Sequence, residues 1–130
     1  MTPAILSLRV RDMAKALAFY LGPLEFTLKR GGDAESNCVV TRGDAELMLE
    51  TAADHYGDEY NAAIRKRLGA PSSAAIYVEA SDLAGFQARL KAAGALIIDP
   101  LRERPWGQSE FTVEDHEGNW LAFWEQTPTS

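Results

Sequence analysis

Cysteine, histidine and long apolar segments are scarce in this sequence of 130 residues, and each scarcity excludes a class of protein. The single cysteine, Cys38, cannot form an internal disulfide, which is compatible with a reducing cytoplasm. No apolar run approaches the roughly 18 residues that a membrane span needs, and the first residues lack the basic flank of a signal peptide. We therefore expect a cytoplasmic protein with no membrane partner.

Basic residues are also in the minority. Thirteen Lys and Arg against nineteen Asp and Glu give a formal net charge of −6. A surface of this sign repels phosphate backbones and attracts cations. The composition therefore predicts no nucleic-acid partner and favours a basic small molecule as a ligand.

The pattern of the first half predicts a strand, a helix and three further strands in one globular domain spanning residues 1–130. Asp12 stands where a helix N-cap belongs, apolar residues follow at helical spacing, and Gly22-Pro23 ends that helix. The expected strands are Ala4 to Val10, Phe26 to Arg30, Asn37 to Arg42 and Glu46 to Glu50.

From Ala74 the same order of elements begins again, which indicates an internal repeat. Asp82, 70 residues after Asp12, is the expected cap of the second helix, and Gly94 ends it. The strands that follow are expected at Leu96-Ile97, Gln108 to Glu114 and Trp120 to Glu125. We therefore divide the domain into module one (1–51), a linker helix (52–71) with Tyr56, Tyr60, Ile64 and Leu68 at helical spacing, and module two (72–130).

Four segments carry a resemblance to a known family: LRVRDMAKALAFY, RGDAELMLE, IYVEASDLAGFQARLKAAGA and PWGQSEFTVEDHEGNWLAFWE. They resemble the superfamily of glyoxalase I, bleomycin-resistance proteins and extradiol dioxygenases, called vicinal oxygen chelate, over nearly the whole chain. The resemblance implies an α+β fold of two βαβββ modules, whose curved mixed sheets surround a cleft, and a homodimer. Two turns depart from the family: Leu24-Glu25-Phe26 has lost a glycine, and His116 stands where proline is common.

Enzymes of that superfamily hold a divalent metal at four inward strand positions, with His, Glu or Gln as ligands. By resemblance these positions fall here at Ile5, Met48, Ser73 and Ala122, none of which is a usable ligand for such a metal. The histidines, His55 and His116, have no second donor at a metal-binding interval in a regular element. We therefore predict no metal, no cofactor and no catalytic residue.

Alternation along the strands assigns each side chain to one of two faces. One face is almost wholly apolar and is expected to face the helices as the core: Leu6, Leu8, Val10, Leu47, Leu49, Ala74, Ile76, Val78, Phe111, Val113, Leu121 and Phe123. The other is expected on the concave side: Ser7, Arg9, Glu46, Met48, Glu50, Ala75, Tyr77, Glu79, Gln108, Glu110, Thr112, Trp120, Ala122 and Trp124. Aromatic planes beside carboxylates suit a cationic, flat ligand.

These features predict a small-molecule binding protein of the bleomycin-resistance type, which confers antibiotic resistance by sequestering a cationic aromatic ligand without transforming it. The predicted ligand-binding residues are Glu46, Met48, Glu50, Tyr77, Trp106, Glu110, Thr112, Trp120 and Trp124.

Other interpretations remain open. The chain could be a glyoxalase-like or dioxygenase-like lyase or isomerase whose metal ligands are displaced to residues such as Glu46, Glu50 and Glu110, or a cofactor-free isomerase. It could also be an interaction module with a vestigial cleft, in which Trp120 and Trp124 fill a closed barrel or a subunit interface. Glu46 and Glu50 are equally compatible with solvated edge positions.

Overall fold

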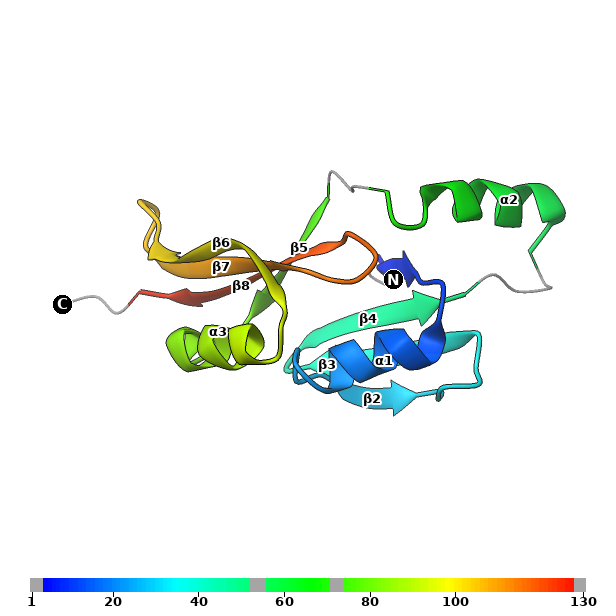
Figure 1. Cartoon of the computed structure of the whole chain (residues 1–130). Helices are drawn as coiled ribbons and strands as arrows, with labels where there is room; N and C mark the ends of the chain where they lie inside the picture. The colour runs from blue at the N-terminus through cyan, green and yellow to red at the C-terminus, as the bar shows by residue number, and fades with distance from the viewer. Residues whose placement is uncertain (1–3, 52–55, 71–73, 128–130) are drawn as a thin grey trace. The chain divides into compact units, whose positions relative to one another are not determined.

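The computed structural model describes residues 4–51, 56–70 and 74–127. The chain divides into two compact units, residues 1–70 and 71–130, each built on its own sheet. Within the described ranges no helix is long and apolar enough to cross a membrane. The structure is α+β, as predicted, with one βαβββ module in each unit (Figure 1). The module and linker boundaries set out above remain a prediction.

Unit 1 contains a four-stranded sheet in the order β1-β4-β3-β2. Its elements are β1 (Ser7–Arg9), α1 (Met13–Leu21), β2 (Thr27–Arg30), β3 (Asn37–Arg42), β4 (Ala45–Glu50) and α2 (Asp58–Arg67). Strand β4 runs parallel to β1 and antiparallel to β3. A chain that pairs its first strand with its fourth in this way needs a crossover, and α1 begins it.

Unit 2 repeats this arrangement in the order β5-β8-β7-β6, with β8 parallel to β5 and antiparallel to β7. Its elements are β5 (Ala75–Glu79), α3 (Leu83–Ala92), β6 (Leu96–Glu103), β7 (Gln108–Glu114) and β8 (Trp120–Gln126). The internal repeat predicted from the sequence is therefore confirmed in both element order and strand order.

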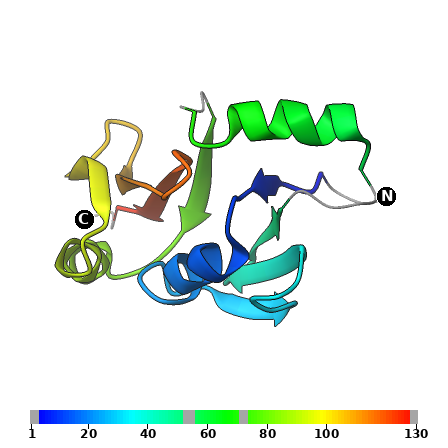
Figure 2. The same ribbon diagram turned by 45° about the vertical axis from the view of Figure 1, so that its right-hand side comes forward.

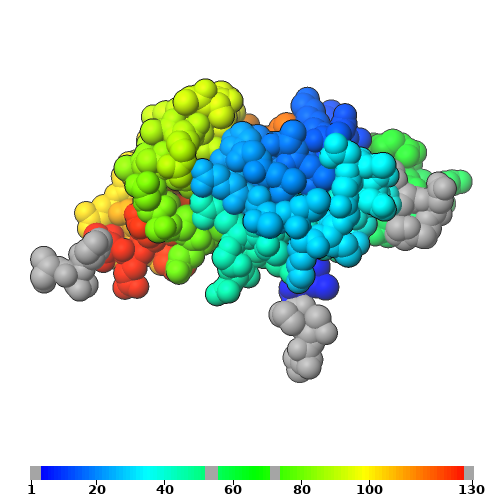
Figure 3. Space-filling model, turned by 90° about the horizontal axis from the view of Figure 1, so that it is seen from below, coloured from blue at the N-terminus to red at the C-terminus, as the bar shows by residue number. Residues whose placement is uncertain are grey.

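Each helix of a module covers the apolar face of its own sheet. Helix α1 buries Met13, Ala16, Leu17 and Tyr20, and Tyr20 meets Phe26 edge to face with ring centroids 5.6 Å apart. Figure 2 shows α1 against one face of the sheet of unit 1, and in the space-filling view of Figure 3 α1 and the chain that follows it form one continuous surface. This packing excludes water from the inner face of the sheet.

The core of unit 2 is built from phenylalanines. Phe86 of α3 lies against Phe111 of β7 and Phe123 of β8, with ring centroids 5.6 and 4.8 Å away, and all three rings are fully buried. Burying a ring of this size stabilises a fold by roughly 1.5–3 kcal/mol.

The predicted apolar face is buried as expected except at two strand beginnings. Leu6 is 41% exposed, Ala74 is exposed and Ile76 is half-buried. These residues lie at the start of β1 and β5, which are edge strands of their sheets. The strand predicted from Ala4 is accordingly shorter and begins at Ser7.

The two helix caps differ, although the sequence predicts the same cap for both. Asp12 accepts a hydrogen bond from the Lys15 amide at 3.1 Å, as predicted. Asp82 also occupies the N-cap position of α3, as predicted, but its side chain makes no capping hydrogen bond. Its backbone is left-handed, with φ of 50°, whereas a capping residue needs an extended backbone to aim its carboxylate at the helix amides. The Asp82 carboxylate instead lies over Gly85, where a Cβ atom would be 2.4 Å from Oδ2.

Candidate functional site

We call the face of each sheet that is turned away from its module helix the outer face, and the polar and aromatic residues predicted for ligand contact lie largely there. In unit 2, strand register places Tyr77, Ala122 and Thr112 in one row across β5, β8 and β7. The next row contains Glu79, Trp124 and Glu110. Side chains in neighbouring rows of one face are within reach of a single small ligand.

Glu110 is a buried carboxylate with spare hydrogen-bonding capacity. Its side chain is only 4% exposed, and Arg104 Nε lies 3.6 Å from its Oε1. Within the part of the chain that the structure describes, Oε1 accepts no hydrogen bond. A buried carboxylate oxygen without a hydrogen-bond donor is costly, so this atom is a natural contact for a donor group of a ligand.

Arg104, the ion-pair partner of Glu110, is shared with a second carboxylate. It pairs closely with Asp99, which Arg102 also contacts at 3.2 Å. The hydrogen bond to Asp99 raises the pKa of Arg104, burial opposes the rise, and the charges of Asp99 and Glu110 add to it. Arg104 therefore stays charged, and its charge is divided between two acidic side chains.

The aromatic residues on the outer face of unit 2 differ in their exposure and in their position relative to Glu110. Trp124 stands opposite Glu110 in the register and is half-buried. Tyr77 is 58% exposed, and Trp120 is 39% exposed with its indole N–H donated to Glu114 at 3.1 Å. Thus Trp124 is the indole in the same row as Glu110.

Trp106 lies apart from these rows, on the turn between β6 and β7. It is 65% exposed, and its indole N–H donates to Gln108 at 3.2 Å. The turn is closed by a hydrogen bond from Gly107 N to the carbonyl of Arg104 at 3.1 Å, and Gly107 has φ of 86°. The proline-tryptophan-glycine sequence forms this tight hairpin because glycine tolerates the left-handed position that the turn requires.

In unit 1 the equivalent rows contain charges that are already paired. Ser7 pairs with Met48, and Arg9 pairs with Glu50, across the parallel strands β1 and β4. Arg9 Nη1 lies 2.7 Å from Glu50 Oε2, and the Ser7 hydroxyl donates to Glu50 Oε1 at 3.1 Å. The predicted contact Met48 is half-buried, and Glu50 is 4% exposed.

Two tyrosines complete this group in unit 1. The Tyr56 hydroxyl donates to Glu50 Oε2 at 2.6 Å, and Arg9 donates to the Tyr60 hydroxyl. The two rings stack with centroids 4.6 Å apart, and the Arg9 guanidinium carbon lies 5.1 and 5.4 Å from the Tyr56 and Tyr60 centroids. We call Arg9, Glu50, Tyr56 and Tyr60 the tyrosine clasp.

The clasp shifts the proton affinity of its members. Burial disfavours the ionised form of Glu50, but hydrogen bonds from Tyr56, Arg9 and Ser7, together with the charge of Arg9, outweigh it and lower the pKa of Glu50. Burial likewise opposes ionisation of Arg9, yet its contacts with Glu50 and the two tyrosines raise its pKa. The hydrogen bond to Glu50 raises the pKa of Tyr56. The group is therefore a charged pair with neutral phenols at neutral pH.

The predicted site residues consequently fall in both units. Glu46, Met48 and Glu50 belong to unit 1, and the remaining six belong to unit 2. Glu46 lies opposite Thr41 and is half-exposed, with its carboxylate 2.5 Å from Lys29 Nζ. The exposure of Glu46 agrees with its interpretation as a solvated residue, whereas Glu50 is 4% exposed and does not fit that interpretation.

Four residues near these carboxylates lie outside the predicted site: Tyr56 contacts Glu50 and Arg104 contacts Glu110, while Tyr60 and Asp99 contact Arg9 and Arg104. The sequence predicts Tyr56 and Tyr60 in the apolar stripe of one linker helix, but α2 begins at Asp58 and Tyr56 lies before it. The spacing of four between the two tyrosines was the available signal. Arg104 and Asp99 carry no such signal, because the register of β6 against β7 shifts twice between Ile97 and Arg102. A register shift changes which residues share a face, so strand alternation alone does not reveal the contact.

The strand positions at which the resemblance places a metal do not fit one. Ile5 and Ala122 carry hydrocarbon side chains and Met48 carries a thioether, while Ser73 lies outside the described residues. Hard and borderline divalent metals require oxygen or imidazole donors. The displaced carboxylates fit no better: Glu46 and Glu50 are four residues apart on one strand, a separation of about 13 Å. Among the residues that the structure describes, no three His, Cys, Asp or Glu side chains gather into a metal-binding group.

Comparisons with known proteins agree with this architecture. The sequence model of the Glyoxalase/Bleomycin resistance protein/Dioxygenase superfamily matches residues 3–123, which confirms the resemblance. No curated protein matches the chain.

Several solved structures share the fold at low sequence identity. TioX from Micromonospora sp. ML1 is 22% identical with a TM-score of 0.72, over 97% of this chain and 99% of that one. A bleomycin-binding protein complexed with bleomycin is 19% identical with a TM-score of 0.66, over 97% and 99% of the two chains. FosX from Listeria monocytogenes, a fosfomycin resistance protein, is 13% identical with a TM-score of 0.65, over 99% and 94%.

Proposed function

Because the chain belongs to the Glyoxalase/Bleomycin resistance protein/Dioxygenase superfamily, we propose that it binds and sequesters a small planar cationic molecule and leaves that molecule chemically unchanged. The observation that carries this proposal is Glu110, a buried carboxylate whose Oε1 has no hydrogen-bond donor among the described residues and which lies opposite the Trp124 indole. A flat ligand stacked on Trp124 would place a donor group at Glu110.

Physical magnitudes support this arrangement. A cation over an indole face contributes about 0.5–2 kcal/mol, and a charge-assisted hydrogen bond to a carboxylate about 1.5–3 kcal/mol. Together with apolar contact area, such terms exceed the cost of immobilising a ligand and give affinities near micromolar, about 8 kcal/mol. The net charge of −6 adds a long-range attraction for cations.

The relatives suggest which compounds to test first. One solved neighbour is a bleomycin-binding protein complexed with bleomycin, so bleomycin is the first probe, followed by smaller planar amidinium compounds. All three tryptophans of the chain, Trp106, Trp120 and Trp124, lie in unit 2. Quenching of tryptophan fluorescence therefore reports binding on unit 2 specifically.

The decisive variant is Glu110→Gln, with Glu103→Gln as its matched control. Both remove one negative charge from unit 2, but Glu103 lies opposite Ser109 and so on the other face from Glu110. We expect Glu110→Gln to weaken binding of the cationic probe about tenfold, roughly one charged hydrogen bond, and Glu103→Gln to leave it unchanged. At about 1 M salt, where charges are screened beyond roughly 3 Å, the difference should shrink. Equal affinities of the two variants for every cationic probe would contradict the proposal.

The contribution of stacking is measured separately. Trp124→Phe keeps an aromatic face, and Trp124→Ala removes it, so affinity should fall in the order wild type, phenylalanine, alanine. Neutral planar compounds should bind wild type and Glu110→Gln alike, because they make no ionic contact. Binding of anionic carbonyl compounds in place of cations would favour the lyase or isomerase interpretation.

We also propose that the protein is a cytoplasmic homodimer. Each sheet ends in edge strands, β1 and β2 in unit 1 and β5 and β6 in unit 2. Exposed edges of this kind favour pairing between chains. Sedimentation should therefore give a species near twice the chain mass of 14.3 kDa. A single species at the chain mass would refute the dimer without bearing on ligand binding.

A further inference from the structure

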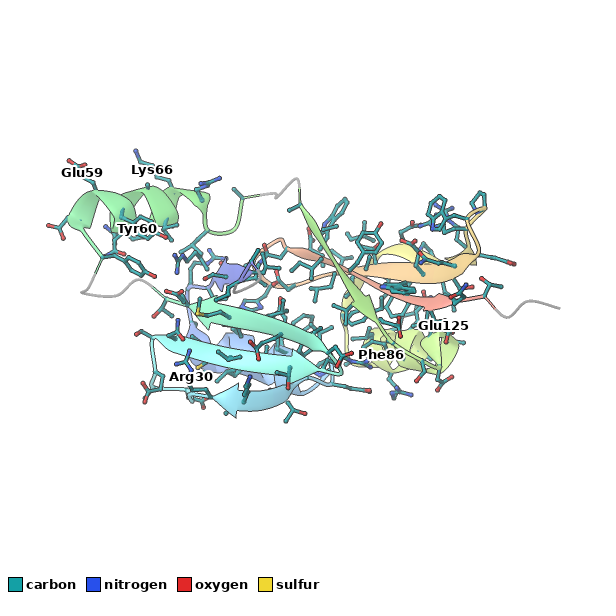
Figure 4. The ribbon with its side chains drawn as sticks, turned by 180° about the vertical axis from the view of Figure 1, so that it is seen from behind. Arg30, Glu59, Tyr60, Lys66, Phe86 and Glu125 are labelled. Carbon is teal, nitrogen blue, oxygen red and sulfur yellow. The ribbon has the colours of Figure 1, made fainter. Side chains whose placement is uncertain are left out.

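Helix α2 is attached to unit 1 without a buried apolar face. None of its residues from Asp58 to Arg67 is fully buried. Figure 4 shows Tyr60 on the side of the helix that is turned toward the strands of unit 1, whereas Glu59 and Lys66 point away from them. A helix that buries so little apolar surface gains little hydrophobic stabilisation from its position. The tyrosine clasp is therefore an important contact between this helix and the strands of unit 1.

The strand half of the clasp is built independently of the tyrosines. Arg9 and Glu50 are register partners on β1 and β4, and the Val10 amide donates to the Glu50 carbonyl at 2.9 Å. The Ser7 hydroxyl and the Arg9 guanidinium both hold the Glu50 carboxylate from the strand side. The sheet thus presents a preformed guanidinium and carboxylate on its outer face.

The tyrosine half has the chemistry of a ligand. It offers two flat rings to the Arg9 guanidinium and one phenol hydroxyl to a Glu50 oxygen. A free molecule with a planar ring and a hydroxyl donor could make the same contacts. Because Arg9 already neutralises Glu50, this face offers a purely cationic molecule no net charge attraction, so its chemistry differs from that proposed for unit 2.

We propose that the Arg9–Glu50 pair is a binding site for planar hydroxyaryl compounds, which Tyr56 and Tyr60 occupy in the free protein and which such a compound takes by displacing them. Binding then requires the clasp to open. The apparent affinity equals the intrinsic affinity multiplied by the open fraction, so removing the tyrosines raises it. This proposal uses residues of unit 1, whereas the proposal around Glu110 uses residues of unit 2, and each is tested by its own experiment.

The test uses 2-naphthol as the probe and 2-methoxynaphthalene as a matched compound without the hydroxyl donor. Binding is followed by the fluorescence anisotropy of the probe. Because unit 1 contains no tryptophan, the binding site is located by changes in the amide chemical shifts of unit 1. We expect the double variant Tyr56→Ala/Tyr60→Ala to bind 2-naphthol about tenfold more tightly than wild type. Lys66→Ala, a change on the far side of α2, should leave the affinity at the wild-type value, and 2-methoxynaphthalene should gain little in any variant.

Two further measurements decide the outcome. Adding Glu50→Gln to the double variant should reduce the gain, because a neutral amide oxygen accepts a hydrogen bond more weakly than a carboxylate and no longer forms an ion pair with Arg9. In wild-type protein, saturating 2-naphthol should increase hydrogen exchange of the amides from residue 58 to residue 67, since the helix loses its anchor; this readout does not depend on any variant folding. Equal affinity of wild type and double variant, a gain that Glu50→Gln does not diminish, or unchanged exchange in α2 would each overturn the proposal.

Discussion

Glu25 offers a direct test of how this fold tolerates a missing glycine. It lies in the turn after α1 and has φ of 62°, a left-handed backbone that favours glycine. Hydrogen bonds hold the turn in place: the Glu25 amide donates to the Gly22 carbonyl at 3.0 Å, and Arg42 Nε donates to the Leu24 carbonyl at 3.1 Å. A glycine at position 25 would therefore keep the same conformation.

The magnitude follows from opposing terms. A left-handed backbone costs a residue with a Cβ atom roughly 1–2 kcal/mol, and glycine escapes this cost. Glycine loses about 0.5–1 kcal/mol more in chain entropy on folding. The Glu25–Arg42 ion pair has a separation of 3.5 Å and a carboxylate that is 39% exposed, so it contributes at most about a few tenths of a kcal/mol. We therefore expect Glu25→Gly to raise the free energy of unfolding by about 0.5 kcal/mol.

Urea denaturation measures this change, provided that the slope against denaturant stays constant. Glu25→Ala is the matched control, because it loses the same ion pair and keeps the strained backbone. It should be less stable than Glu25→Gly by about 1 kcal/mol. The reverse change, Gly43→Ala, meets no atom within 4 Å but imposes a Cβ at φ of 58°, so it should destabilise by a similar amount. An alanine variant at position 25 as stable as the glycine variant would refute the reasoning.

Three other predictions concern the buried groups of the two units. The folded state lowers the pKa of Glu50, so the stabilisation from its ionised form is present above its unfolded pKa of roughly 4.3 and is lost as pH falls through the lower folded pKa. In urea titrations, the stability difference between wild type and Glu50→Gln should therefore shrink between neutral pH and about pH 3. Phe123→Ala removes a fully buried ring from its contacts with Phe86 and Phe111 and should lower the free energy of unfolding by about 3–5 kcal/mol. A decrease below about 1 kcal/mol in the same measurement would show that the core is not packed as described. Asp115→Ala removes an acceptor of the Glu117 and Asn119 amides, at 2.9 and 2.8 Å, and should destabilise by roughly 1–3 kcal/mol, whereas Asp115→Asn, which keeps an acceptor oxygen, should recover part of the loss in thermal unfolding.

The local elements of this fold could be predicted from the sequence because their causes are local. Asp12 caps α1 through an amide three residues away, and Gly94, with φ of 82°, follows the end of α3. Alternation along the strands correctly assigned the buried phenylalanines Phe111 and Phe123 to one face and Glu110 to the other, since successive side chains of a strand point in opposite directions. The repeat of the whole pattern gave two modules with one strand order.

The partners of the candidate site residues were decided only by the tertiary structure. The sequence does not distinguish the surroundings of Glu50 and Glu110. Glu50 contacts Ser7, Arg9 and Tyr56, whereas Glu110 meets a single arginine, whose Nε lies 3.6 Å from its Oε1. The difference arises from where α2 returns over β1 and from the register shifts of β6, which bring together residues distant in the sequence or out of alternation. Asp82 shows the same limit on a smaller scale, because with φ of 50° its side chain makes no capping hydrogen bond at the N-cap position that the sequence predicts. Sequence patterns determine which face a side chain occupies, whereas its neighbours on that face depend on how strands and helices pack in three dimensions.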